Sequence, residues 1–283
     1  MNSGGGKFLS FLYGTAPGRL LLKPLVSRPV SKVCGALMNT RISALFVPAF
    51  VKRNGIDLSD YEPVNYGSFN DFFTRQVKAG HRPVDTDPAH LIAPCDGLLT
   101  VYGISDSTVF TVKQSRFTLA GLFGGVRDDL VRGFDGGLCL VFRLCVNHYH
   151  RYCYFDSGSK GENVFISGKL HTVRPVALEA LPVFTENCRE YTVIESDSFG
   201  KAVQMEVGAL LVGKILNHDS SGAIVRGREK GMFLFGGSTV ILILSKDTAE
   251  INSDIIETNR RGEEYRVKLG QTIGCAPGAT SAD

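Results

Sequence analysis

The sequence predicts an α+β fold in which an N-terminal helical segment packs on or beside a predominantly antiparallel or mixed β body. Residues 1–56 are rich in leucine and phenylalanine, and four prolines divide them into pieces of helical length. After Pro83 the pattern changes to short β-branched and apolar runs that are separated by Gly, Asp, Asn and Pro. Because no regular helices alternate with these runs, an antiparallel or mixed sheet is expected.

The charge distribution divides the chain at nearly the same place. Residues 1–56 carry eight basic and no acidic side chains, whereas the rest carries 23 basic and 28 acidic ones. A basic arm whose cations alternate with leucine indicates an anionic membrane surface rather than nucleic acid. We therefore expect residues 1–60 to form a basic amphipathic membrane-associating region and residues 61–283 to form a β-rich domain. A helical layer whose charges are simply solvated is the alternative.

The elements can be assigned in order. Ser68–Val77 has the pattern of a capped helix, with Ser68 at the N-cap and Asp71 at the third helical position. No apolar run in the arm reaches the length of a membrane span. The predicted strands are 92–94, 98–104, 107–112, 138–154, 163–176, 190–196, 203–215, 223–225, 232–244 and 265–269.

One stretch organises the rest, residues 231–245. It contains an apolar segment, a Gly236-Gly237 break and a β-branched strand from Thr239, with Ser238 at the joint. The two glycines allow backbone conformations that would let Oγ of Ser238 reach the carbonyl of Gly237. Taken alone, this pattern is most often a glycine turn before a buried strand.

Two histidines and a carboxylate could act on that serine. His148 and His150 stand two residues apart and would share one face of a strand, whereas Cys153 falls on the other face. A third metal ligand is therefore missing, and we expect no metal. His150 is the candidate general base, and Asp96, in a Pro-Cys-Asp-Gly turn, is the candidate that orients it. The alternatives are a packed histidine and an ordinary turn.

Asn187 and Arg189 form another candidate site. An arginine beside an asparagine suits a phosphate or carboxylate ligand, although a surface ion pair is the commoner outcome.

Self-processing would unite these residues. Asp96 would orient His150, and His150 would activate Ser238, whose Oγ would attack the carbonyl of Gly237. Elimination and hydrolysis would then leave an N-terminal pyruvoyl group made from Ser238. That group forms a Schiff base with a substrate amine and accepts electrons as CO₂ leaves.

At these residues the chain resembles the phosphatidylserine decarboxylase proenzymes, and most of all the bacterial type II members. The resemblance runs from about Leu12 to about Gly274. The segments that carry it, in order, are Phe69-Asn-Asp-Phe-Phe-Thr-Arg75, Pro94-Cys-Asp-Gly97, Tyr149-His-Arg151, Gly168-Lys-Leu-His-Thr-Val173, Asn187-Cys-Arg-Glu190, Val207-Gly-Ala-Leu-Leu-Val-Gly213 and Phe235-Gly-Gly-Ser-Thr239.

The resemblance implies cleavage between Gly237 and Ser238 into a β chain, 1–237, and an α chain, 238–283, that begins with the pyruvoyl group. It implies that Asp96 and a histidine of the Tyr-His-Arg segment assist Ser238. It also implies phosphatidylserine as substrate, with phosphatidylethanolamine and CO₂ as products. The arm would then hold the enzyme peripherally on the cytoplasmic side of a bacterial membrane. Whether the chain forms a homodimer is left open.

The chain departs from the family pattern at one position. Many members have a second histidine where this sequence has Cys153, and the relay role is usually assigned to that histidine. We therefore expect His150 to take this role, with His148, His171 and Cys153 as the other candidates, although a thiol is a poor base near pH 7.

Three other functions stay open at this stage. A pyruvoyl decarboxylase could act on a soluble amino acid instead of a lipid. A serine hydrolase could use Ser238, His150 and Asp96, although the chain lacks a G-x-S-x-G elbow at this serine. A non-catalytic membrane-surface relative is the third alternative.

Overall fold

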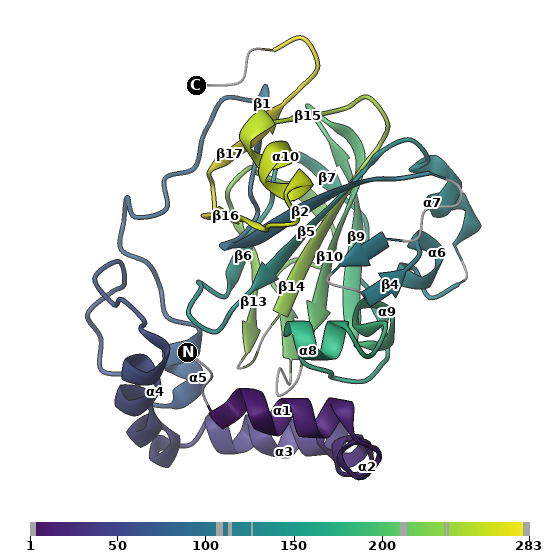
Figure 1. Cartoon of the computed structure of the whole chain (residues 1–283). Coiled ribbons are helices and arrows are strands. Elements are labelled where there is room, and N and C mark those ends of the chain that lie inside the picture. Colours follow the sequence, from purple (N-terminus) through teal and green to yellow (C-terminus); the bar gives the residue numbers. More distant parts are fainter. Residues whose placement is uncertain are drawn as a thin grey trace.

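A helical arm lies beneath a body of antiparallel sheets (Figure 1). The computed structural model describes residues 4–105, 110–112, 115–125, 127–209, 214–234, 236 and 238–279. The predicted α+β class is confirmed. Gly237, the predicted cleavage residue, and parts of the predicted strands 107–112, 203–215 and 232–244 lie outside the described residues.

Prolines lie at the start of α2, α3 and α4, as the sequence pattern suggested, whereas Pro24 lies inside α2 and does not divide the arm there. The prolines at the helix starts occupy one of the first two positions of α2, α3 and α4, where the missing amide proton costs no helical hydrogen bond. The arm comprises α1 (Gly4–Gly14), α2 (Ala16–Leu25), α3 (Arg28–Met38), the 3-10 helix η1 (Arg41–Phe46) and α4 (Val47–Asn54). The later helices are α5 (Phe69–Phe73), α6 (Leu119–Leu122), α7 (Asp128–Gly133), α8 (Pro175–Leu178), α9 (Val183–Glu186) and α10 (Ser253–Arg260).

The arm is fastened to the body by apolar and polar contacts. Leu12, Tyr13, Leu22 and Val26 are buried within the main hydrophobic core. The hydroxyl of Tyr13 accepts a hydrogen bond of 3.1 Å from the amide of Thr172. Burial of four large side chains at about 1.5 to 3 kcal/mol each makes this attachment substantial.

The strands form one large sheet and three small ones. The large sheet has the order β12-β7-β9-β10-β14-β5-β2-β16, with β8 beside β9, and the small ones are β11-β13-β6, β1-β17-β15 and β3-β4. The strands of the large sheet are β2 (Gly97–Gly103), β5 (Leu138–Leu144), β7 (Gly158–Lys160), β8 (Val164–Ile166), β9 (Arg189–Ser196), β10 (Gly200–Gly208), β12 (Gly222–Ile224), β14 (Ser238–Leu244) and β16 (Tyr265–Val267). The others are β1 (His90–Ile92), β3 (Phe110–Val112), β4 (Ser115–Phe117), β6 (Arg151–Cys153), β11 (Lys214–Asn217), β13 (Glu229–Leu234), β15 (Glu250–Ile251) and β17 (Thr272–Cys275).

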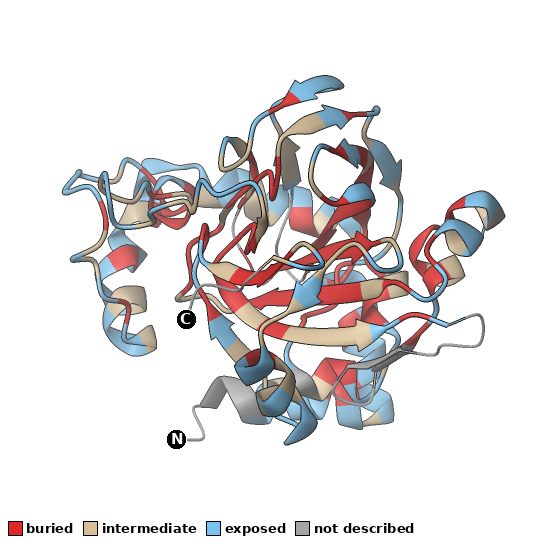
Figure 2. Ribbon diagram, turned by 90° about the horizontal axis from the view of Figure 1, so that it is seen from above, coloured by how far each residue is buried: buried red, intermediate tan, exposed pale blue. Residues whose placement is uncertain are grey.

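Strand β14 lies at the centre of the large sheet, between β10 and β5. Every one of its residues is buried, in agreement with its continuous β-branched and leucine sequence. Figure 2 shows that the strands inside the body are mostly buried. Ser238 is its first residue and is paired with Gly208 at the end of β10 and with Leu144 at the end of β5. That end of the sheet faces the helical arm (Figure 1).

The structure corrects several predicted elements. The helix predicted over Ser68–Val77 spans only Phe69–Phe73, although Ser68 does cap it by accepting a 3.0 Å hydrogen bond from the amide of Asp71. The strand predicted over 138–154 is divided into β5 and β6, so His148 and His150 lie on the connecting loop and share no strand face.

Helices also occur within the β body, contrary to the expectation that they are confined to the N-terminus. The strand predicted over 163–176 is observed only over Val164–Ile166, and its last two predicted residues belong to α8, which begins at Pro175. Among the described residues, no single helix has the length and apolar character needed to cross a membrane. Only the segments Arg28–Met38 and Arg41–Asn54, taken together across a bend of 82°, pass on length and composition.

Candidate active site

Ser238 and His150 are in direct contact inside the protein. The Oγ atom of Ser238 lies 3.2 Å from Nδ1 of His150. The other ring nitrogen, Nε2, lies 3.0 Å from the carbonyl oxygen of Cys145. A carbonyl only accepts hydrogen bonds, so Nε2 carries the proton and Nδ1 presents its lone pair to the serine hydroxyl. This tautomer is the one that a general base requires.

The surroundings of His150 keep its ring neutral. The side chain is fully buried, and Phe73 packs on the imidazole with 4.1 Å between ring centroids. Burial, with a smaller contribution from the charge of Arg75, lowers the pKa of His150 well below its usual value. The unprotonated base therefore persists at and below neutral pH.

Arg75 holds the loop that carries the histidines. Its guanidinium donates a 3.0 Å hydrogen bond to the carbonyl of His148 and lies 4.3 Å from the ring centroid of Tyr61 and 5.0 Å from that of Phe72. The side chain is almost completely buried. Arg75 thus fixes the backbone two residues before His150.

Asp96 is placed near this loop but is engaged elsewhere. Its two carboxylate oxygens accept a bidentate pair of hydrogen bonds from Arg82, both 2.8 Å long, and one oxygen also accepts from the amide of Leu269. Among the described residues, neither ring nitrogen of His150 has Asp96 as a hydrogen-bond partner. The structure therefore brings Ser238 and His150 together. The imidazole is oriented by its hydrogen bond to the carbonyl of Cys145 and not by Asp96.

A cavity lies on the Asp96 side of the loop. It has a volume of about 240 Å³ and is lined by Asp96, Arg82, His148, Tyr61 and Arg266, among others. The amide of Cys145 donates a 3.1 Å hydrogen bond to Nδ1 of His148. Burial lowers the pKa of His148 to about 4, and the charge of Asp96 opposes this shift. His148 is thus neutral at pH 7.

The environment of Cys153 does not suit a base. The thiol is fully buried, and burial raises its pKa to about 12. The amide of Cys153 donates to the carbonyl of Pro94, and its own carbonyl accepts from Gln204. A thiol with this pKa is protonated at neutral pH, so it cannot take a proton from Ser238.

The predicted anion site at Asn187 and Arg189 has another role. Arg189 is buried and donates to four backbone carbonyls, those of Leu122, Thr185, Asn187 and Gly121. The guanidinium of Arg189 therefore binds backbone carbonyls, and forms neither the predicted anion site nor a surface ion pair. The Nδ2 of Asn187 donates to the carbonyl of Gly208, at 2.7 Å, and so fixes the end of the strand that pairs with Ser238.

Comparison with known proteins shows the family of the chain. A family model described as phosphatidylserine decarboxylase matches residues 69–275. The chain belongs to the phosphatidylserine decarboxylase family. It is accordingly an enzyme, a decarboxylase.

Individual relatives cover nearly the whole chain. A protein of Clostridium acetobutylicum named phosphatidylserine decarboxylase proenzyme 2 is 43% identical over 267 residues, which is 94% of this chain and 91% of the relative. Proteins named phosphatidylserine decarboxylase proenzyme from Clostridium botulinum and Ruminiclostridium cellulolyticum are 37% and 38% identical, over 96% and 95% of this chain and 94% and 91% of the relatives. The similarity therefore includes the arm as well as the β body.

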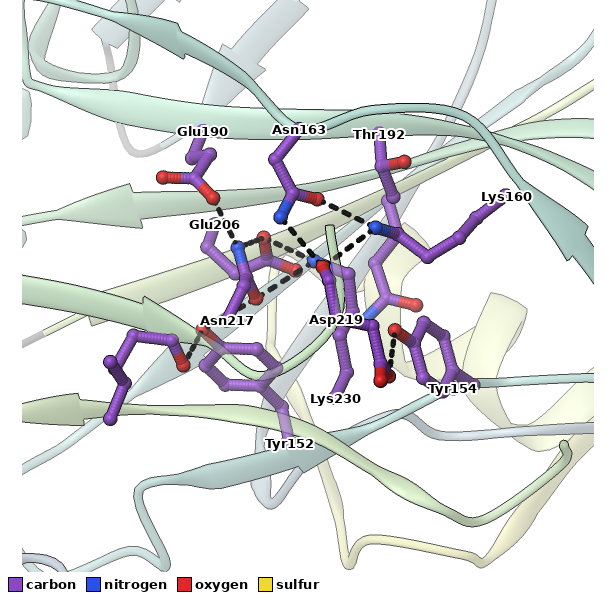
Figure 3. Close-up of polar contacts among 12 residues, drawn as sticks. Tyr152, Tyr154, Lys160, Asn163, Glu190, Thr192, Glu206, Asn217, Asp219 and Lys230 are labelled. Carbon is purple, nitrogen blue, oxygen red and sulfur yellow. Dashed lines mark hydrogen bonds and ion pairs between the residues drawn. The ribbon is translucent and has the colours of Figure 1, made fainter. Parts of the chain in front are cut away.

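A buried polar network is a further feature of this decarboxylase (Figure 3). Lys230 on β13 and Glu206 on β10 form a 2.6 Å ion pair, and both side chains are completely buried. Asn217 accepts from Lys230 at 3.0 Å and donates to Glu190 at 2.7 Å. Burial raises the pKa of Glu206, and the neighbouring Lys230 opposes this shift. Glu206 precedes Gly208 by two residues, so it lies on the same face of the sheet as Ser238.

Sequence reasoning missed several residues of this site. Phe73 and Arg75 were noted only as part of a helix and a motif, although their contacts with His150 and its loop define the base. Arg82 was not noted at all. An apolar helix that ends in Phe-Phe-Thr-Arg gives no local signal of such contacts, because they depend on how α5 packs on a loop about 75 residues away. Among the described residues, no group of three His, Cys, Asp or Glu side chains has a geometry that could hold a metal.

Proposed function

We propose that this decarboxylase is made as a precursor that cleaves itself between Gly237 and Ser238 and then decarboxylates phosphatidylserine. The observation that carries the proposal is the buried contact of 3.2 Å between Oγ of Ser238 and Nδ1 of His150. Ser238 is also the first residue of the central strand, so a new chain end at this position would be held by β10 and β5.

The cleavage needs no group beyond those in the chain and water. Nδ1 of His150 takes the proton of the Ser238 hydroxyl, and Oγ forms a bond to the carbonyl carbon of Gly237. The peptide C–N bond breaks, and the freed nitrogen of Ser238 receives the proton. Loss of the Cα proton then breaks the Cβ–Oγ bond and releases Gly237 as a carboxylate. The resulting enamine tautomerises, and water replaces its nitrogen as ammonia.

The residues around Ser238 fit a pyruvoyl group at this position. The side chain of Ser238 is fully buried, and the neighbouring hydroxyl of Thr239 is buried without a hydrogen-bond partner among the described residues. Because successive side chains of a strand point to opposite faces, this hydroxyl does not face the side chain of Ser238, and the fit rests on the burial of Ser238 and on the imidazole of His150 beside it. The pyruvoyl group would supply an electron-accepting carbonyl for the departure of CO₂. His150 then remains beside the group as a neutral imidazole that can hold or deliver a proton.

Phosphatidylserine is favoured over a soluble amino acid by the arm. Large apolar side chains are exposed on it, with exposed fractions of 67% for Leu20, 72% for Ile42 and 78% for Leu45. The same segment carries eight cations and no acid. Exposed leucines among cations suit the interface of an anionic bilayer. We place the enzyme peripherally on the cytoplasmic face of the cell membrane.

The test of this function measures CO₂ release from phosphatidylserine in mixed micelles and from free serine. Mature wild-type protein is expected to release CO₂ from the lipid only, and the Ser238→Ala variant from neither. Release from free serine at a comparable rate would favour the soluble substrate. Hydrolysis of a simple ester without CO₂ release from any amine would favour a serine hydrolase.

A further inference from the structure

A cavity beside the serine site has a composition that suits a phosphate ester. It has a volume of about 420 Å³ and lies between α3, the segment 165–170 and the strands β9, β10 and β11. Its wall includes Gly208, which is paired with Ser238 on the next strand. Neighbouring strands lie about 5 Å apart, so the cavity ends one strand away from the reacting residue.

The charged residues of this cavity are mainly cations. Arg28 and Lys32 come from α3, one helical turn apart, and Lys214 comes from β11. Among the described residues, none of the three has an acidic side chain within ion-pair distance. Arg28 instead donates to Oγ of Ser167, at 3.2 Å, and its guanidinium lies 5.2 Å from the ring centroid of Phe165. Three cations without counter-ions around one cavity indicate an anionic ligand.

The remaining wall is divided by polarity. Phe165, Leu170 and Ile215 are apolar, whereas Glu190 contributes a carboxylate that accepts a hydrogen bond from Asn217. A ligand with a phosphodiester, an ammonium group and an apolar part would match the cations, the carboxylate and the apolar side chains of this cavity, respectively. A free amino acid has no phosphodiester and would leave the cations of α3 without a partner.

We propose that Arg28, Lys32 and Lys214 bind the phosphodiester of the substrate headgroup in this cavity, with its amine directed towards Ser238. This proposal rests on the proposed function. It assigns α3 a place in the substrate site in addition to any contact with the membrane surface, because α3 lies beneath the same end of the sheet at which β10 ends (Figure 1).

The test distinguishes binding of the headgroup in the cavity from the general attraction of the basic arm to a membrane surface. Arg28→Gln and Lys32→Gln are compared with Lys23→Gln and Arg41→Gln. All four residues are exposed and lie on the same arm, but only Arg28 and Lys32 line the cavity. The substrate is a short-chain phosphatidylserine used below its micelle concentration, so no membrane surface is present. Intact mass and thermal unfolding establish that each variant is processed and folded.

The cavity variants are expected to raise KM about tenfold with little change in kcat, because a hydrogen bond to a charged group is lost in each. The control variants should stay within about twofold, and Arg28→Lys should recover part of the loss. A KM that rises equally in the cavity and control variants, or in neither, would overturn the proposal.

The same three cations could bind free inorganic phosphate instead of the phosphodiester of the lipid headgroup. A second measurement distinguishes these two ligands. Inorganic phosphate is added to the mature enzyme as an inhibitor of turnover. If the cavity variants lose inhibition by phosphate but keep the wild-type KM for the lipid, the cavity binds free phosphate and the headgroup assignment is wrong. If wild-type protein is processed but releases no CO₂ from any phosphatidylserine, the proposed function itself fails.

Discussion

The carbonyl oxygen of Cys145, and not the carboxylate of Asp96, accepts the Nε2 proton of His150, at 3.0 Å. The imidazole is therefore set in its base tautomer by the backbone of its own loop. Asp96 forms its strongest contacts with Arg82. Processing should therefore depend more on His150 than on Asp96.

Replacement of the base should nearly abolish processing. His150→Gln keeps a polar side chain but has no basic nitrogen, so cleavage is expected to slow by a factor of about 10² or more. The rate is measured from the appearance of the small chain after cell-free synthesis. His218→Gln is the matched control, because His218 is half-exposed and pairs with Glu229. Normal cleavage of His150→Gln would exclude His150 as the base.

Asp96→Asn should act mainly through stability. The side chain of Arg82 is only 6% exposed, and it would lose the charge of Asp96 while keeping its 3.0 Å ion pair with Asp60, so we expect a cost of about 1.5 to 3 kcal/mol. We expect a lower urea midpoint in the Ser238→Ala background and a smaller loss of cleavage than in His150→Gln. If Asp96→Asn stops cleavage completely and leaves the midpoint unchanged, Asp96 takes part in the proton relay directly.

The pH dependence of cleavage reports the state of His150. Because burial lowers its pKa, the neutral base persists as the pH falls through the usual histidine value, and it is lost only at lower pH. Cleavage by the folded precursor should therefore stay within about twofold between pH 8 and pH 5.5, whereas a base of ordinary pKa, about 6.5, would slow it about tenfold. A decline centred near pH 6.5 would contradict the buried, neutral imidazole.

Cys153 should be dispensable for the chemistry. Its thiol has a pKa of about 12 and is protonated at neutral pH. Cys153→Ala retains the small buried side chain, and its cleavage rate is expected to lie within about threefold of wild type once its modest loss of stability is allowed for. A loss as large as that of His150→Gln would show that the thiol has replaced the family's second histidine in function.

The buried ion pair of Glu206 and Lys230 should be costly to break. Lys230→Met leaves the carboxylate of Glu206 buried without its counter-charge and is expected to destabilise the chain by about 3 to 5 kcal/mol. Urea unfolding of the Ser238→Ala background measures this without interference from cleavage. Adding Glu206→Leu should restore most of the loss. Equal instability of the double variant would mean that the pair's other hydrogen bonds, with Asn217, matter more than its charge.

The sequence predicted the fold class and the central strand well, because β-branched runs and proline positions are local signals. The extent of single elements was less predictable. The run 138–154 begins with apolar residues, but its polar segment from Asn147 to Arg151 overlaps a loop at 145–150, where backbone groups of Cys145 bond the two histidines. The contact of His150 with Ser238 follows from the motifs. The roles of Arg82, Phe73 and the Cys145 carbonyl depend on packing between distant segments and have no local signature.

The intact mass of the purified protein, beside that of the Ser238→Ala variant, tests the central claim most directly. The account predicts two chains for the wild type, split between Gly237 and Ser238, and a single chain for the variant. The small chain should be lighter than a chain that starts with serine by one ammonia and should resist N-terminal sequencing. A wild-type protein that stays whole under native conditions, or a small chain that starts with an intact serine, would contradict it.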